Sequence, residues 1–233
     1  GRRGEPHRIE AVEVTADTPM EEYAWGAASM GYLATHTGTA SKTDAAIVEI
    51  PRSISVVTRQ EMEDRGANSV MDAMTYSAGV STELQGIDSR VDDIRIRGFD
   101  ASSWSNNMYL DGLRLPRGGQ WTTAQVDAYG LKGPAAVLYG QVTPGGLVNM
   151  VAKRPSFDHR NEVILSGGSF NQYEGAFDLG GSLDESGNWL GRLVGSYNDG
   201  DAQVDETELS RIYIAPSATW FVNDSTDITF LSY

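Results

Sequence analysis

The C-terminal third of the chain alternates polar and apolar side chains along three long segments, 172–183, 189–199 and 208–222. Because successive side chains of a β-strand point to opposite sides, this period of two predicts strands with one apolar and one polar face. Gly187 and Asn188 predict a tight hairpin turn between the first two segments. The apolar face is formed by Tyr173, Phe177, Leu179, Leu183, Trp189, Leu193, Tyr197, Ile212, Ile214 and Trp220.

The length of these segments distinguishes two architectures. Strands of a soluble β-sandwich usually have roughly 3–10 residues, and these segments run to about ten or more, as strands of a transmembrane barrel do. Trp189 and Tyr197 are separated by roughly 26 Å of strand at about 3.3 Å per residue. Such a span suits the two edges of a tilted barrel's apolar band, about 25 Å tall. We therefore predict about five antiparallel strands of a transmembrane β-barrel over 161–233, with a soluble sandwich as the alternative.

Residues 41–160 show shorter and mixed periods, which predict a compact α/β segment. A strand over 54–58 leads into a helix over 59–65, which starts at Thr58 as its N-cap and ends at Gly66. Glu61 follows Thr58 by three residues and completes a capping-box pattern. Further predicted elements are a second helix over 69–76, with Val70, Ala73 and Met74 on its apolar face, and strands around 94–96 and 108–110.

Residues 1–40 show little periodicity and are predicted to be an extended arm. Within the arm, β-forming residues alternate over 9–16. On the pattern alone this segment is either an ordinary first strand or a strand that pairs with the sheet edge of a partner.

Charge and composition exclude several classes of function. The formal net charge of −14 argues against a nucleic-acid partner, because binding phosphate requires clustered Lys and Arg. Residues 161–233 hold 12 acidic and 2 basic side chains, which fits a solvated acidic surface or a polar barrel lumen with acidic loops. The absence of Cys and the wide spacing of three His argue against thiolate chemistry and structural zinc. The sequence has no run of about 18 apolar residues, so it predicts no helix that spans a membrane.

Glycine turns close a series of short β-type runs in the middle of the chain. The runs are Ile94-Arg95-Ile96-Arg97-Gly98-Phe99, Tyr109-Leu110-Asp111-Gly112-Leu113, Lys132-Gly133-Pro134 and Pro144-Gly145-Gly146-Leu147-Val148-Asn149. In order and spacing they resemble the plug domain of TonB-dependent outer-membrane receptors, which import ferric siderophores. The resemblance extends over about residues 9–160, and Trp25-Gly26 ahead of Lys42-Thr43-Asp44 further resembles the hydroxamate, or ferrichrome-type, branch.

The resemblance implies an α+β plug domain over 41–160, followed by the first antiparallel strands of a transmembrane β-barrel that has about 22 strands in the family. It implies a monomer in the outer-membrane lipid of a Gram-negative bacterium, with the plug facing the periplasm. Transport would be driven by TonB and its inner-membrane motor proteins. The iron keeps the oxygens of its siderophore, so no protein-bound metal or cofactor and no catalysis are expected.

The β-forming segment of the arm matches the TonB box of the family. The resemblance therefore favours a strand that TonB pairs with, and main-chain hydrogen bonds would carry the grip. The residues concerned are Ile9, Glu10, Ala11, Val12, Glu13, Val14, Thr15 and Ala16.

In the family, outward-facing plug loops touch the siderophore, and the matching loops here are 82–89, 101–107 and 115–122. The family pattern has Arg where Gln85 stands and Tyr where Gln120 stands, so the contact chemistry differs. A ferric hydroxamate has a compact, largely uncharged head, which suits Trp faces and a single Arg donor. The predicted contacts are Gln85, Ser103, Trp104, Arg117, Gln120 and Trp121, with plug–barrel packing as the alternative for either Trp.

One arginine, Arg97, and one lysine, Lys132, are predicted to have structural roles. Arg97 and Lys132 would hold the plug against the barrel through charge pairs with carboxylates of the barrel wall. One departure from the family bears on Lys132. An acidic–basic strand of roughly six residues, normally found between Leu131 and Lys132, is missing, and roughly 20 Å of extended chain is enough to remove a plug strand. Five strands cannot close a barrel, so a longer chain is expected.

Other functions stay open at this stage. A soluble plug-like binding module is one alternative, and a receptor for haem, cobalamin or a glycan is another. Asp92 with Asp93, or Glu61 with Glu63 and Asp64, could be proposed as acid–base groups of an enzyme. Adjacent carboxylates at a helix start or in a loop are usually solvated, so we do not expect an enzyme.

Overall fold

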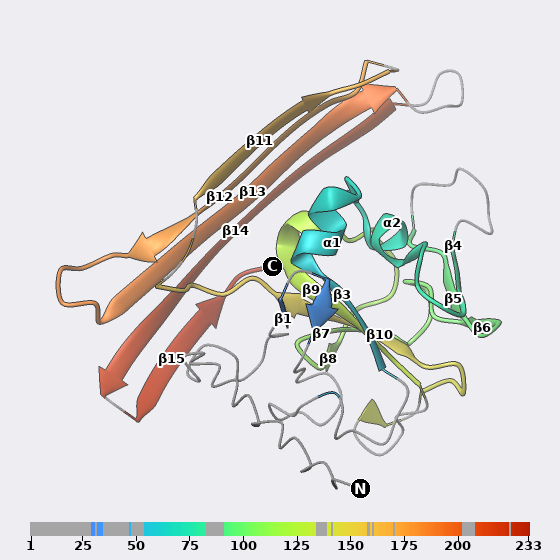
Figure 1. Cartoon of the computed structure of the whole chain (residues 1–233), viewed down its shortest axis with the longest axis horizontal. Helices are drawn as coiled ribbons and strands as arrows, with labels where there is room; N and C mark the ends of the chain where they lie inside the picture. Colours follow the sequence, from blue (N-terminus) through green and yellow to red (C-terminus); the bar gives the residue numbers. More distant parts are fainter. Residues whose placement is uncertain are drawn as a thin grey trace, which may run out of the picture.

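The computed structural model describes residues 29–30, 32–34, 47, 54–82, 91–133, 139–140, 142–157, 159, 161–169, 171–201, 208–223 and 225–233. Their elements form two parts (Figure 1): an α/β unit built from β3 to β10, and a long curved sheet built from β11 to β15, called here the wall sheet. Within these ranges, no helix is long and apolar enough to cross a membrane.

The α/β unit contains short elements joined by turns. A small hairpin of β1 (Ser29–Met30) and β2 (Leu33–Ala34) precedes it. The elements of the unit are β3 (Ile54–Thr58), α1 (Arg59–Asp64), α2 (Val70–Met74), β4 (Val80–Thr82), β5 (Ile94–Ile96), β6 (Phe99–Asp100), β7 (Met108–Leu110), β8 (Leu113–Arg114), the 3₁₀ helix η2 (Thr123–Gln125), β9 (Val126–Lys132) and β10 (Leu147–Ala152).

Side-chain caps start both α-helices, as the sequence predicts. The Thr58 hydroxyl accepts a hydrogen bond from the Glu61 N–H at 3.3 Å, and α1 ends before Gly66, whose φ is +62°. For α2 the cap is Ser69, whose hydroxyl accepts from the Asp72 N–H at 3.1 Å, while the Asp72 carboxylate accepts from the Ser69 N–H at 3.0 Å. Both helices are shorter than predicted, and α2 buries Val70, Ala73 and Met74 on the expected face.

A five-stranded sheet in the order β3-β9-β10-β7-β8 forms the centre of the α/β unit. Strand β9 runs antiparallel to both of its neighbours, pairing Tyr129 with Val57 on one side and with Met150 on the other. The shorter connection before Lys132 therefore does not leave this sheet without a strand between β3 and β10. Residues 126–132 themselves occupy the position between β3 and β10.

The core lies where this sheet meets the two helices. Val57, Val126, Tyr129, Val148 and Met150 from the sheet pack in one cluster. Met62 of α1 and the buried face of α2 complete that cluster, together with Ile94 and Ile96 of β5. A separate three-stranded sheet, β4-β5-β6, is anchored to the core through these two isoleucines.

The wall sheet is an antiparallel meander in which each strand pairs with the next. Its strands are β11 (Glu162–Gly167), β12 (Tyr173–Ser182), β13 (Trp189–Asp201), β14 (Glu208–Asn223) and β15 (Thr226–Leu231). Figure 1 shows these strands beside the α/β unit, and η2 of that unit contacts β13. The turn between β12 and β13 includes Gly187 (φ +72°) and Asn188, as predicted.

The two faces of the wall sheet differ as the alternation predicts. On β13, Leu190, Arg192 and Val194 are buried, whereas Leu193 and Tyr197 are exposed. The exposed apolar face continues across β14, where Trp220 pairs with Trp189 and their rings stack with centroids 5.4 Å apart. A sheet that buries its mixed face and exposes its apolar face is the arrangement of a barrel wall, because lipid solvates the outer side.

Candidate functional site

Two loops of the α/β unit that carry predicted siderophore contacts lie against each other, and we call residues 101–107 and 115–122 the paired loops. The Gly118 N–H donates to the Ser103 carbonyl at 2.8 Å. The Arg117 Nε donates to the Asn106 Oδ1 at 3.2 Å. The Trp104 ring lies over Gly118, at 3.7 Å from the place of a Cβ atom there. One backbone bond, one side-chain bond and one ring contact therefore fix the relative position of the loops.

The predicted contacts differ in how they are presented on the paired loops. The Trp104 side chain is 57% exposed, and Arg117 is exposed close to it, so an aromatic face and a guanidinium are available together. Gln120 is half-buried. Ser103 is only 2% exposed, and its hydroxyl accepts from the Asp92 N–H at 3.2 Å. The Ser103 hydroxyl therefore makes a hydrogen bond within the α/β unit and does not face the surface of the loops. Gln85 lies outside the described residues.

Trp121 occupies a more internal position than Trp104. Its side chain is half-buried and packs against the main core cluster. Its backbone is held on both sides, since its N–H donates to the Asp92 Oδ2 at 2.9 Å and its carbonyl accepts from the Val70 N–H at 3.2 Å. This environment favours the packing alternative for Trp121, and it leaves Trp104 as the exposed indole of the paired loops.

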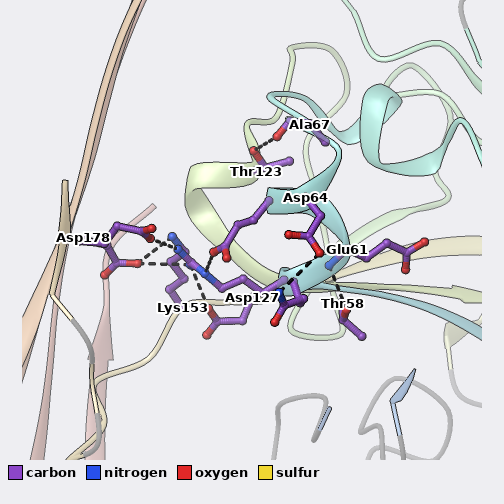
Figure 2. Close-up of polar contacts among 12 residues, drawn as sticks. Thr58, Glu61, Asp64, Ala67, Thr123, Asp127, Lys153 and Asp178 are labelled. Carbon is purple, nitrogen blue, oxygen red and sulfur yellow. Dashed lines mark hydrogen bonds and ion pairs between the residues drawn. The ribbon is translucent and has the colours of Figure 1, made fainter. Parts of the chain in front are cut away.

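A second polar site joins the α/β unit to the wall sheet, and we call it the interface cluster: Arg59, Asp127, Lys153, Glu162, Asp178 and Arg192. Figure 2 labels three of its members, Asp127, Lys153 and Asp178, of which Asp178 is a residue of β12. The Asp178 carboxylate is 2.8 Å from the Lys153 Nζ, 2.8 Å from the Arg192 Nε and 3.3 Å from the Arg59 Nη1.

Two cations of the interface cluster, Arg59 and Arg192, also contact carboxylates other than Asp178. Arg59 also contacts Glu162 of β11 at 3.0 Å, and Arg192 contacts Asp127 of β9 at 3.4 Å. Arg59, Asp127 and Lys153 belong to the α/β unit, and Glu162, Asp178 and Arg192 belong to the wall sheet. Burial lowers the pKa of Lys153, and the neighbouring Arg59 acts in the same direction, while Asp178 opposes both. The cluster thus links the two parts by the buried pair of Lys153 and Asp178 and by partly exposed pairs around it.

Sequence reasoning did not identify the interface cluster. Its partners are far apart in the chain, with Arg59 and Asp178 separated by 119 residues. The available signal was the placement of Asp178 and Arg192 on the non-lipid face of their strands, where alternation had already put them. In register, Asp178 pairs with Val194 and Arg192 with Gly180, so the two charges lie diagonally across neighbouring strands, within side-chain reach.

The structural role predicted for Arg97 and Lys132 stays a prediction. Arg97 is exposed at the turn after β5, where its φ is +51° and its N–H donates to the Gly79 carbonyl at 2.7 Å. Lys132 closes β9 and pairs in register with Ile54 and Leu147. Residues 9–16 lie outside the described residues. In the described part of the chain, no group of three or more His, Asp or Glu residues has the arrangement of a metal site.

Comparison with known proteins places these features in a family. The TonB-dependent Receptor Plug Domain matches residues 46–147. The chain is 40% identical over 230 residues to the ferrichrome outer membrane transporter/phage receptor of Escherichia coli K12, covering 96% of this chain and 30% of that protein. It is 38% identical over 226 residues to the ferrioxamine receptor of Yersinia enterocolitica, covering 94% of this chain and 31% of that protein.

Solved structures of outer-membrane receptors also match the fold of this chain. The pyoverdine outer membrane receptor FpvA from Pseudomonas aeruginosa PAO1, bound to pyoverdine, matches 85% of this chain with a TM-score of 0.76 and 28% identity. The match covers 29% of that receptor, so the chain spans less than a third of the length of each of these three proteins. The two sequence relatives are named as a transporter and a receptor, and neither name is that of an enzyme. The chain belongs to the TonB-dependent receptors, and it comprises a plug domain and the antiparallel wall strands that follow it.

Proposed function

We propose that this protein is an outer-membrane receptor that binds a ferric siderophore of the hydroxamate type and imports it into the periplasm. The observation that carries the proposal is the similarity to the ferrichrome and ferrioxamine receptors along nearly the whole chain. The exposed pair of Trp104 and Arg117 on the paired loops supports it. An indole face and one guanidinium suit the apolar rim and the oxygen atoms of an uncharged iron chelate.

The proposal assigns a role to each segment. Residues 1–40 form the periplasmic arm, residues 41–160 the plug and residues 161–233 the first strands of the barrel. TonB and its inner-membrane motor proteins supply the energy by pairing with residues 9–16. The exposed apolar face of the wall sheet contacts lipid, and the receptor works as a monomer. Ferric iron enters as cargo, held by its siderophore.

Binding by the full-length receptor, purified in detergent, tests the proposal. Ferrichrome and ferrioxamine B, loaded with iron, are titrated while tryptophan fluorescence is followed, with haem and cyanocobalamin as competitors of different chemistry. We expect saturable quenching with at least one ferric hydroxamate and none with haem or cobalamin. Saturable binding of haem or cobalamin alone would overturn the hydroxamate assignment.

Uptake in cells gives the second test. A strain that lacks its own hydroxamate receptors, and carries this gene, should take up iron-55 from the same siderophore. The matched strain without TonB should bind the siderophore at the surface and accumulate no iron. Equal accumulation with and without TonB would contradict energy transfer through that partner.

A further inference from the structure

Asp92 lies beneath the paired loops and contacts both of them. We propose that Asp92 is a positioning residue for ligand binding, which holds the two loops in the arrangement that presents Trp104 and Arg117. The inference rests on the proposed function, since it takes the paired loops as the place where the siderophore is bound.

The contacts of Asp92 reach each loop separately. Toward the loop 101–107, the Asp92 N–H donates to the Ser103 hydroxyl at 3.2 Å, and the Asp92 carbonyl accepts from the Ser103 N–H at 2.8 Å. Toward the loop 115–122, the Asp92 Oδ2 accepts from the Trp121 N–H at 2.9 Å. The preceding residue, Val91, forms a parallel bridge with Gly119. Two residues thus bind both loops through main-chain and carboxylate groups.

Burial of the Asp92 carboxyl group costs free energy, because the group loses its hydration. The side chain has no exposed surface, and within the described part of the chain its Oδ1 has no hydrogen-bond partner. A buried acceptor that lacks a partner loses hydration without compensation. Packing alone does not favour a carboxyl here, because an apolar side chain would avoid this penalty. The bond to the Trp121 N–H is the contact that only an acceptor can make.

The charge of the Asp92 carboxyl group changes with pH in the neutral range. Burial raises the pKa of Asp92 to about 7, against the lowering effect of the bond from the Trp121 N–H. The charged groups that face it are Asp72 of α2, which raises the pKa, and Arg211 of β14, which lowers it. The buried phenol of Tyr129 on β9 lies within electrostatic reach as well. Above pH 7 the carboxyl group is charged, and burial disfavours the charged form by more than the bond from the Trp121 N–H favours it, so ionisation costs free energy in the folded arrangement of the loops.

Three forms of the full-length receptor test the inference: wild type, Asp92→Ala and Asp92→Asn. Asparagine is neutral at all pH values and keeps an oxygen that accepts from the Trp121 N–H, whereas alanine removes the acceptor. The affinity for the ferric hydroxamate that the wild type binds is measured at pH 6, 7 and 8. Loss of one buried hydrogen bond corresponds to about a tenfold change in affinity.

We expect about tenfold weaker binding for Asp92→Ala at pH 6 and near wild-type binding for Asp92→Asn. Wild-type affinity should fall between pH 6 and pH 8, and the affinity of Asp92→Asn should stay level. Wild-type affinity in Asp92→Ala, or the same pH profile in Asp92→Asn as in wild type, would overturn the inference. If Asp92→Ala does not fold, the comparison of wild type with Asp92→Asn still decides.

The same experiment separates this inference from the proposed function. If the wild type binds no ferric siderophore, the proposed function fails, and the positioning role fails with it. If the wild type binds and all three forms bind alike at every pH, the proposed function stands and only the role of Asp92 is rejected.

Discussion

At the scale of single residues, one carboxylate connects the two parts of the molecule. Asp178 receives contacts from Lys153 and Arg59 of the plug and from Arg192 of the wall. The Asp178, Lys153 and Arg192 side chains are nearly buried, so their charges are poorly hydrated and depend on each other. Removing a cation leaves Asp178 with other partners. Removing Asp178 leaves two buried cations without their common anion.

Substitution of Asp178 should therefore destabilise the receptor strongly. We expect Asp178→Ala to lower the free energy of unfolding by about 3–5 kcal/mol, the usual cost of breaking a buried ion pair from one side. Thermal unfolding in detergent measures the change. Glu174→Ala is the matched control, because Glu174 lies on the same face of β12 and accepts a hydrogen bond from Ser166 at an exposed position. Equal effects of the two substitutions would contradict a special role for Asp178.

The raised pKa of Asp92 makes a prediction about stability. The folded protein keeps its proton up to about pH 7, whereas an unfolded chain loses it near the ordinary value of 3.8. The folded state therefore binds more protons between these values, and its stability falls as pH rises from about 4 to 7. Melting temperatures of wild type and Asp92→Asn, measured across this range, should converge at low pH and separate toward pH 7. Parallel curves would rule out titration of Asp92.

At the scale of helices and strands, local patterns predicted much of the structure. Thr58 and Ser69 start the two helices because their hydroxyls satisfy backbone N–H groups three residues ahead, a purely local interaction. The alternation around Trp189 and Trp220 predicted which face of the wall sheet is exposed, because the strand period is fixed. The resemblance to a plug domain added the order of the central elements.

The remaining features depend on partners that are distant in the chain. Strand β9 mixes the buried Val126 and Tyr129 with small and polar residues, so its local pattern does not mark it as a central strand, a position that it takes because β3 and β10 pair with it on either side. The hydrogen bond between Trp121 and Asp92 joins residues 29 positions apart. The interface cluster joins three wall strands to the plug. No window of local sequence contains both sides of these contacts.

Glycines of the wall sheet give an element-scale prediction. In β13, a Cβ atom on Gly195 would collide with the ring of Phe177 on β12, its partner in register. In β12, a Cβ atom on Gly175 would make an ordinary contact of 3.5 Å with Leu165. We expect Gly195→Ala to destabilise the receptor by about 1–3 kcal/mol, the usual cost of overpacking. Gly175→Ala should be neutral or slightly stabilising.

Melting temperatures of the two glycine variants, measured in the same detergent, check this expectation. Since both substitutions add one methyl group to a paired strand, a difference between them reports on the Phe177 ring alone. Equal melting temperatures would mean that the ring moves aside without cost.

At the scale of the whole molecule, the proposed transport would require that the paired loops and the N-terminal arm act together. The proposed TonB box at residues 9–16 would pair through its backbone, so side-chain size should matter less than backbone donors. We expect Val12→Pro to abolish siderophore-dependent iron uptake, because proline lacks the N–H and fixes φ. Val12→Ala is the matched control and should retain uptake.

Two measurements on the same cells check the Val12 prediction. Surface binding of the ferric siderophore should be equal in wild type, Val12→Pro and Val12→Ala, and iron-55 accumulation should be lost in Val12→Pro alone. Normal accumulation in Val12→Pro would show that TonB grips another segment.

The position of β3 determines how the plug responds to mechanical tension. Strand β3 is an edge strand whose single neighbour in its sheet is β9. A pull on the chain ahead of Ile54 that peels β3 away from β9 would load the pair Ile54–Lys132 first and the pair Thr58–Ala128 last, so the hydrogen bonds would break one after another. The next residue is Arg59, whose ion pairs to Glu162 and Asp178 anchor it to the wall. Such a pull would therefore separate β3 from β9 before it reaches the ion pairs of Arg59 with the wall sheet. Strand β3 could then extend while the rest of the plug keeps its contacts with the wall.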